Sequence, residues 1–173
     1  VGCHRYSVVK DGMYIGSYTV GPEYETLSAF GSGNGITDPR TVVKANEYCS
    51  LYGMDTISCG HMIQWLIECK ERGLISDEEA GVKLEWGNDE TVVELTRMIA
   101  MREGIGDLLA KGAKRASEEI GGDSYKWAMQ AKGLEQSRVE TRSSYSYALA
   151  FAINSRGPDH LNTECLVERG GSE

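Results

Sequence analysis

"DPRTVVKANEYCSLYG", residues 38–53, contains the start and stop signals of a complete helix, and much of the chain is organised in the same way. Asp38 is a residue type that caps the free N–H groups at a helix start, and Pro39 is favoured at the first helical position. Gly53 can adopt the left-handed conformation that commonly ends a helix. We therefore expect one helix between Asp38 and Gly53.

The same punctuation recurs downstream. A helix at about 57–72 should end at Gly73, and a short one should follow Ser76 in "SDEEAG". A further helix should begin at Asn88 or Asp89 and close at Gly104. Its apolar residues recur at helical spacing and are expected to face the core: Val92, Val93, Leu95, Met98 and Ile99.

Two more helices are expected towards the C-terminus. One covers about 106–120 and ends at the pair Gly121-Gly122. The other is "SYALAFAINS", residues 146–155, which is apolar nearly all round and is therefore expected to be buried.

Residues 6–20, "YSVVKDGMYIGSYTV", have the composition of a β-hairpin. β-Branched and aromatic residues flank Asp11-Gly12, which predicts two short strands joined by a primed turn. The predicted fold class is therefore mainly α: a multi-helix domain with a small β-hairpin element near the N-terminus.

Composition limits the classes of function. The chain has 173 residues, 40% of them apolar, and a net charge of −8 with no run of Lys or Arg, so we expect no nucleic-acid partner. No apolar run approaches the ~18 residues of a membrane span, so we expect no membrane association. The opening "VGCHRYS" has neither an initiator Met nor a signal peptide, and we expect a piece of a longer protein.

The five cysteines do not have the pattern of a secreted disulfide framework. Their number is odd and no C-x-x-C occurs, so we expect a reducing cytoplasm, with Cys49, Cys59 and Cys69 as small buried hydrophobic residues. A zinc site at Cys59 and His61 is the less favoured alternative, because a second pair of ligands is missing.

Three stretches indicate chemistry more than packing. "GPEYET", residues 21–26, places Glu23, Tyr24 and Glu25 at a chain reversal set by Gly-Pro. Asp55 lies just beyond a predicted helix C-terminus, where the helix dipole does not favour an acid. It either caps the next helix or has a functional role.

The third stretch is "NSRGPDHLN", residues 154–162. A helix breaks there at Gly157-Pro158 and is followed by His160. A lone histidine is more often structural than functional, so both interpretations stay open at this point.

Taken together, five motifs in this order resemble the tungsten-containing aldehyde:ferredoxin oxidoreductases. They are "GPEYET", "YGMDTIS", "REGIGDLLAKGAKRASEEIGG", "KGLE" and "NSRGPDHL", and the resemblance extends from Cys3 to about His160. It implies a large enzyme in which a β-rich N-terminal domain packs on two largely helical domains. Residues 1–130 would form the first helical domain, and 131–173 the beginning of the following, C-terminal helical domain.

The resemblance also implies cofactor-binding residues. The family holds a [4Fe-4S] cluster with C-x2-C-x3-C and a distant fourth cysteine, and Cys3 would be the third ligand. Cys165 lacks the surroundings of the fourth ligand and is not assigned. The pterin-binding motif D-x-x-G-L-D reads "SLYGMD" here, so Asp55 and Gly53 carry over while Ser50 replaces the first acid.

The catalytic residues implied by the resemblance are Glu25, with Glu23 as the alternative, and His160. Both would lie close to the metal, although "GPDHLN" departs from the usual G-x-C-H-L-R. The family's E-x-x-H pair, which binds an iron between subunits, reads "KANE" here, from Lys44 to Glu47. We therefore expect that bridging metal to be absent.

The implied activity is oxidation of aldehydes to carboxylic acids. A tungsten (or molybdenum) bis-pterin would accept the electrons, and the [4Fe-4S] cluster would pass them to ferredoxin. Glu25 would act as base and His160 as hydrogen-bond donor. The alternatives are reduction of a carboxylic acid or a CoA thioester, and a non-catalytic helical interaction domain. The isolated chain is expected to hold neither cofactor, to be inactive and to self-associate; a homodimer is the expected form of the intact enzyme if it assembles.

Overall fold

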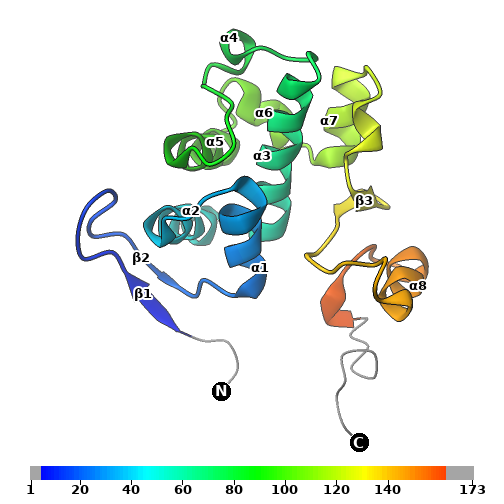
Figure 1. Ribbon diagram of the computed structural model, residues 1–173, viewed down its shortest axis with the longest axis horizontal. Helices are drawn as coiled ribbons and strands as arrows, with labels where there is room; N and C mark the ends of the chain where they lie inside the picture. Colours follow the sequence, from blue (N-terminus) through cyan, green and yellow to red (C-terminus); the bar gives the residue numbers. More distant parts are fainter. Residues whose placement is uncertain (1–4, 163–173) are drawn as a thin grey trace, which may run out of the picture.

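The computed structural model describes residues 5–162, and these residues are mainly helical, as predicted (Figure 1). The α-helices are α1 (Tyr24–Thr26), α2 (Pro39–Tyr52), α3 (Thr56–Glu71), α4 (Asp77–Ala80), α5 (Asp89–Met101), α6 (Ile105–Leu109), α7 (Ala113–Ile120) and α8 (Tyr145–Ile153). The strands are β1 (Tyr6–Val8), β2 (Tyr18–Val20), β3 (Gln130–Ala131) and β4 (Leu134–Glu135). Short 3₁₀ turns cover Ser32–Asn34, Ser124–Lys126 and His160–Asn162.

Helix α3 forms the centre of the core. Its Trp65, Leu66 and Ile67 are almost completely buried. Helices α5 and α7 contact α3, and α2 packs against α5 (Figure 1). The apolar stripe predicted on α5 is buried along its whole length, which confirms that it faces the core.

Most of the predicted helix ends are confirmed, but α5 ends at Met101, with Arg102 in the left-handed conformation, and not at Gly104 as predicted. The Asp38 carboxylate accepts the backbone N–H of Arg40, Pro39 is the first helical residue, and Gly53 ends α2 at φ 67°. Helix α4 has a complete capping box, in which Ser76 and Glu79 each bond the backbone of the other. Helix α5 begins after Asn88, whose side chain accepts the N–H of Thr91.

The single helix predicted at 106–120 is wrong. The chain forms α6 and α7 instead, separated at Gly112, which has φ 79°. The break frees the N–H of Ala113, and the buried carboxylate of Glu135 accepts it at 2.6 Å. The interruption is therefore stabilised by a residue that is distant in sequence, and the local pattern does not reveal it.

The N-terminal hairpin is confirmed, but its predicted two-residue primed turn is wrong. Tyr6 pairs with Val20 and Val8 with Tyr18, so the connection runs over residues 9–17. Gly12 does have a positive φ, yet the strands do not meet beside it. A second hairpin, β3–β4, was not predicted; its loop is Lys132-Gly133, with both residues at positive φ, as a type I′ turn requires.

The prediction that the last helix is buried is wrong. In α8 only Tyr147 and Phe151 are buried. Three residues spaced by four share an exposed stripe: Tyr145, Leu149 and Ile153 are 79%, 62% and 69% exposed. Figure 1 shows α8 beside the last described turn, joined to the helical core through β3 and the residues after it.

Helix α1 continues into a π-helical turn, Leu27–Gly31, whose Ala29 and Phe30 are fully buried. The peptide bond that precedes this segment, between Gly21 and Pro22, is cis. Between residues 5 and 162, no helix combines the length and the apolar composition that crossing a bilayer requires.

Candidate functional site

Two neighbouring side chains of α1 bind the backbone of one residue, Arg138, in the segment after β4. The carboxylate of Glu25 accepts the backbone N–H of Arg138 at 2.9 Å. The hydroxyl of Tyr24 donates to the carbonyl oxygen of the same residue at 3.2 Å. The motif "GPEYET" therefore links the start of the helical core to a segment more than a hundred residues later.

His160 completes this cluster. Its Nδ1 atom lies 3.9 Å from Oε1 of Glu25, and the two side chains are only 23% and 13% exposed. Nδ1 of His160 is buried and has no hydrogen-bond partner within residues 5–162. The structure thus brings the two residues predicted to be catalytic close together and leaves Nδ1 of His160 without a hydrogen bond from the described residues.

Glu23, the alternative acid, does not join the cluster. It occupies the N-cap position of α1, its side chain makes no capping hydrogen bond, and it is exposed. The geometry favours Glu25 over Glu23 as the acid that acts with His160.

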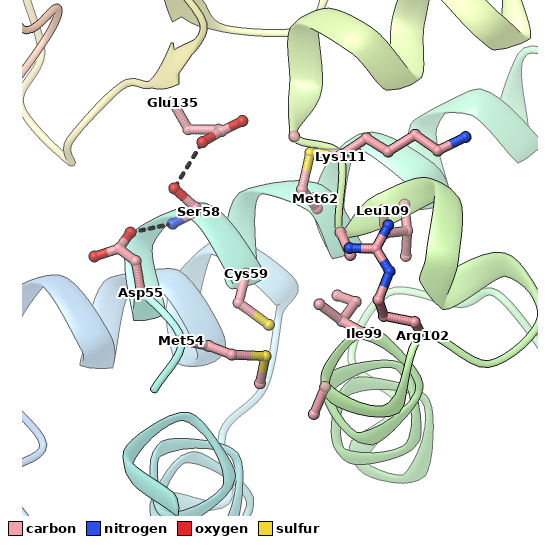
Figure 2. Close-up of a pocket in the computed structure, with 13 residues that line it drawn as sticks. Met54, Asp55, Ser58, Cys59, Met62, Ile99, Arg102, Leu109, Lys111 and Glu135 are labelled. Atoms are coloured by element: carbon pink, nitrogen blue, oxygen red, sulfur yellow. Dashed lines mark hydrogen bonds between the residues drawn. The ribbon is translucent and has the colours of Figure 1, made fainter. Parts of the chain in front are cut away.

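Asp55 caps α3, as one of its two interpretations predicted. Its Oδ2 atom accepts the N–H of Ser58 at 2.7 Å. The same carboxylate lines a cavity of about 420 Å³ between α3 and the α5–α7 region (Figure 2). Capping fixes the orientation of Asp55 and leaves its second oxygen free of any hydrogen bond from the described residues.

Ser58 and Glu135 form one wall of this cavity. Ser58 Oγ donates to Glu135 at 2.6 Å, and the carboxylate of Glu135 is buried (Figure 2). Opposite them, Figure 2 shows Arg102 and Lys111, each of which has an acidic partner: Asp107 and Glu119 respectively.

The other predicted cofactor-binding residues lie apart from this wall. Ser50 and Gly53 are exposed at the end of α2, outside the lining of the cavity. In "KANE", Lys44 forms an ion pair of 2.7 Å with Glu47, so a cation stands where the family has a ligand acid. Cys3 and Cys165 lie outside the described residues. Cys49, Cys59 and Cys69 are buried with free thiols, as predicted.

The described residues fit a pterin better than a directly bound metal. A pterin ring carries an amide N–H beside an amino group, which a carboxylate such as that of Asp55 can accept. Within residues 5–162, no three His, Cys, Asp or Glu side chains gather as a metal site would require. In this part of the chain the protein would hold the organic part of the cofactor.

The cavity and the Glu25–His160 cluster are neighbours. The hydroxyls of Thr26, at the end of α1, and Thr56, at the start of α3, lie 2.9 Å apart. This hydrogen bond fixes the residue after Glu25 to the residue after Asp55. The hydrogen bond therefore links the segment that carries Glu25 to the segment that carries Asp55.

Burial lowers the pKa of two basic side chains, those of His61 and Arg138. Burial lowers the pKa of His61 to about 4, with the charge of Arg138 acting in the same direction. Burial also lowers the pKa of the Arg138 guanidinium, while the charge of Glu25 opposes that shift. At neutral pH His61 is uncharged, and Arg138 is the buried cation of this region.

Sequence reasoning did not identify Arg138, Ser58 or a role for Glu135. Glu135 had a signal, because it is the acid of the motif "KGLE". Arg138 had none, since it follows a hairpin too short to be recognised from hydrophobic pattern.

Comparisons with known proteins point to one family. The sequence profile described as "Aldehyde ferredoxin oxidoreductase, domains 2 & 3" matches residues 1–171. The tungsten-containing aldehyde ferredoxin oxidoreductase of Pyrococcus furiosus is 39% identical over 93% of this chain and 26% of its own length. The aliphatic sulfonate oxidoreductase, WOR-like subunit, of the same organism is 31% identical over 98% of the chain and 28% of its own length.

A solved structure has the same fold. The active-site complex BamBC of benzoyl coenzyme A reductase, determined with 1,5-dienoyl-CoA, superposes with a TM-score of 0.65 at 23% identity, over 81% of this chain and 23% of that one. The chain thus spans about a quarter of the length of its relatives. From the profile match and these identities, the chain belongs to the aldehyde ferredoxin oxidoreductase family.

Proposed function

We propose that the complete polypeptide is a tungstopterin oxidoreductase that oxidises small aldehydes to carboxylic acids. The observation that carries this proposal is the approach of Glu25 and His160 to 3.9 Å, beside a carboxylate-lined cavity. The family membership and the tungsten-containing relatives support the same activity. Electrons would pass through a [4Fe-4S] cluster to ferredoxin.

The residues of this chain have separate roles in the proposal. Conversion of an aldehyde and water to an acid releases two electrons and two protons, so a base is needed. Glu25 takes a proton from water or the aldehyde hydrate, and the N–H of Arg138 holds its carboxylate in place. His160 donates a hydrogen bond to the carbonyl oxygen and stabilises the negative charge that develops there.

Asp55 would hold the pterin through the oxygen that its capping bond leaves free. Cys3 would be a ligand of the cluster. When bound, the metallopterin supplies the two-electron acceptor and the cluster transfers electrons singly. Molybdenum in place of tungsten, a cytoplasmic location and a homodimer remain predictions.

A different substrate is the main alternative within the family. The sulfonate oxidoreductase relative matches nearly the whole chain, and reduction of a carboxylic acid or CoA thioester uses the same kind of cofactor. From a different class, a non-catalytic helical interaction domain would keep the fold without the cofactors.

Metal analysis of the complete polypeptide, purified without oxygen, separates these classes. The proposal expects about one tungsten per chain and aldehyde-dependent reduction of ferredoxin. Tungsten and molybdenum both absent from a folded protein would establish the interaction domain instead. Metal present with no aldehyde oxidation would favour the alternative substrates.

A further inference from the structure

A second cavity is lined by Arg138, the residue whose backbone N–H bonds Glu25. It has a volume of about 360 Å³, within the range of small-molecule sites. Side chains of α3 and residues 136–140 line it, together with all three tryptophans of the chain: Trp65, Trp86 and Trp127. The cavity therefore combines aromatic and polar side chains.

The cation among these polar groups is the guanidinium of Arg138. Its Nη1 atom donates to Gln64 at 2.9 Å, and Gln64 is in turn fixed by a bond to the carbonyl oxygen of Ala29. Its Nε and Nη2 atoms are buried and have no hydrogen-bond partner within residues 5–162. Burying charged donors without an acceptor is costly, so these two N–H groups indicate an absent acceptor.

The unpaired atoms are the edge of a guanidinium that binds carboxylates. Nε–H and Nη2–H point in parallel and match the two oxygens of an oxyanion. The chain uses this same edge elsewhere: Arg97 bonds Glu94, and Arg142 bonds Glu140, each through Nε and Nη2. Of these three arginines, only Arg138 has this edge without a partner among residues 5–162.

Two further buried polar groups line the same cavity. His61 is only 5% exposed, and its Nε2 atom lacks a partner among the described residues. The hydroxyl of Ser137 is likewise buried and unpartnered there. Both residues line the cavity with Arg138, so three polar side chains lack partners in one place.

The acids around the cavity do not neutralise Arg138. Glu68 pairs with Arg72 and Glu140 with Arg142, each at 2.6 Å. Glu25, whose charge acts on the guanidinium, is bonded to the backbone N–H of Arg138 and to none of its side-chain nitrogens within the described residues. Arg138 would repel a cationic ligand. A neutral ligand would only partly satisfy the hydrogen-bonding capacity of its Nε and Nη2 atoms.

We propose that this cavity binds the acid group, a carboxylate or a sulfonate, of a small organic substrate. The oxyanion would bond Nε and Nη2 of Arg138, and the apolar part of the molecule would lie against the tryptophans. The inference deepens the proposed function and rests on it: one residue, Arg138, contacts the catalytic acid with its backbone and the substrate's anion with its side chain. The preferred aldehydes would then be those that carry a second, acidic group.

Binding can be measured without turnover. Isothermal titration of the complete polypeptide with butanoate, butane-1-sulfonate and the neutral butanamide tests charge and head group separately. We expect at least one oxyanion to bind about ten- to hundredfold more tightly than the amide, and Arg138→Gln to abolish that preference. Equal binding of all three compounds, or an unchanged preference in Arg138→Gln, overturns the inference.

Two further variants keep this test decisive. Arg97→Gln is the matched control, because it removes the same fork from an ion pair on α5, and it should keep the oxyanion preference. Should Arg138→Gln fail to fold, Arg138→Lys keeps the charge and loses the fork. It should weaken oxyanion binding while the amide is unaffected, and wild-type affinity in Arg138→Lys would contradict a bidentate site.

Kinetics separate this inference from the proposed function. With the tungsten-loaded enzyme, the ratio of kcat/KM for 4-oxobutanoate over butanal should fall at least tenfold in Arg138→Gln. An unchanged ratio overturns the anion site and leaves aldehyde oxidation intact. Failure of the wild type to oxidise either aldehyde overturns the proposed function, while the titration still decides whether the cavity binds oxyanions.

Discussion

Ser58 Oγ and the carboxylate of Glu135, 2.6 Å apart, join the first turn of α3 to strand β4. The same carboxylate accepts the N–H of Ala113 at the start of α7. One buried side chain therefore satisfies two donors from different helices, at a wall of the cavity that Asp55 also lines. The arrangement makes Glu135 a structural centre of the site.

Glu135→Ala should destabilise the 173-residue chain by about 2–3 kcal/mol, because two buried donors lose their acceptor. Glu135→Gln should cost less, since an amide can still accept one N–H. Urea denaturation followed by circular dichroism measures both. Glu140→Ala, at an exposed ion pair, is the control and should change stability by less than about 1 kcal/mol.

Glu25→Gln should lower kcat of the complete enzyme by about 10²–10⁴, because the amide keeps the shape but cannot take a proton. Folding stability should change little by comparison, since the amide oxygen can still accept the N–H of Arg138. Glu23→Gln, on the exposed N-cap, is the matched control with near-normal turnover. Near-normal turnover of Glu25→Gln would move the catalytic assignment to Glu23.

Stability should fall as the pH is lowered from about 6.5 towards 4, because His61 is buried in its neutral form. Its pKa is about 4 when folded, below the ordinary histidine value of 6.5, so the unfolded chain binds the extra proton over this interval. The contribution of His61 is at most about 1.4 kcal/mol per pH unit. His61→Gln should flatten this part of the profile, and an unchanged slope would show that other groups cause it.

Gly60→Ala should destabilise the fold by about 1–3 kcal/mol through overpacking. A Cβ atom at Gly60 would lie 2.6 Å from the carbonyl oxygen of Ala29, so α3 and the π-helical turn would have to separate. Gly31→Ala is a matched control in the same turn, where the added atom meets its nearest neighbour at 3.6 Å. Thermal unfolding of both variants distinguishes steric overlap from a general cost of replacing glycine.

The 173-residue chain on its own should self-associate through the exposed stripe of α8, since large apolar patches favour association. The double variant Leu149→Glu, Ile153→Glu should shift the chain towards monomer in sedimentation velocity. Tyr125→Glu changes an exposed aromatic residue outside α8 and should have no such effect. A wild-type chain that stays monomeric at all concentrations would contradict the prediction.

The sequence predicted the helix ends that are fixed by capping residues close by in the chain. Asp38, Gly53 and Ser76 act through atoms only a few residues away, so their roles can be read from spacing alone. The break at Gly112 depends instead on Glu135, which a local pattern cannot show. The apolar composition of α8 led to a wrong prediction of burial, because composition does not show whether a neighbour covers a helix.

The candidate site residues also divide into those that have a sequence signal and those that have none. Glu25, Asp55 and His160 were found through motifs, and the structure adds how they are placed relative to one another. Arg138 was missed because its proposed role depends on two nitrogen atoms that have no partner among residues 5–162, and no residue pattern encodes this property of three-dimensional packing.

The hydrogen bond between Glu25 and Arg138 spans 113 residues, and that between Ser58 and Glu135 spans 77. Contacts between such distant residues require large loops to close, which slows their formation compared with local helical turns. During refolding, helical circular dichroism should therefore recover before the cluster of Glu25, Arg138 and His160 is assembled. A chain interrupted near residue 130 would retain its capped helices and lose the Glu25–Arg138 and Ser58–Glu135 hydrogen bonds. We therefore expect the segment after β3 to be the last part of the candidate site to assemble.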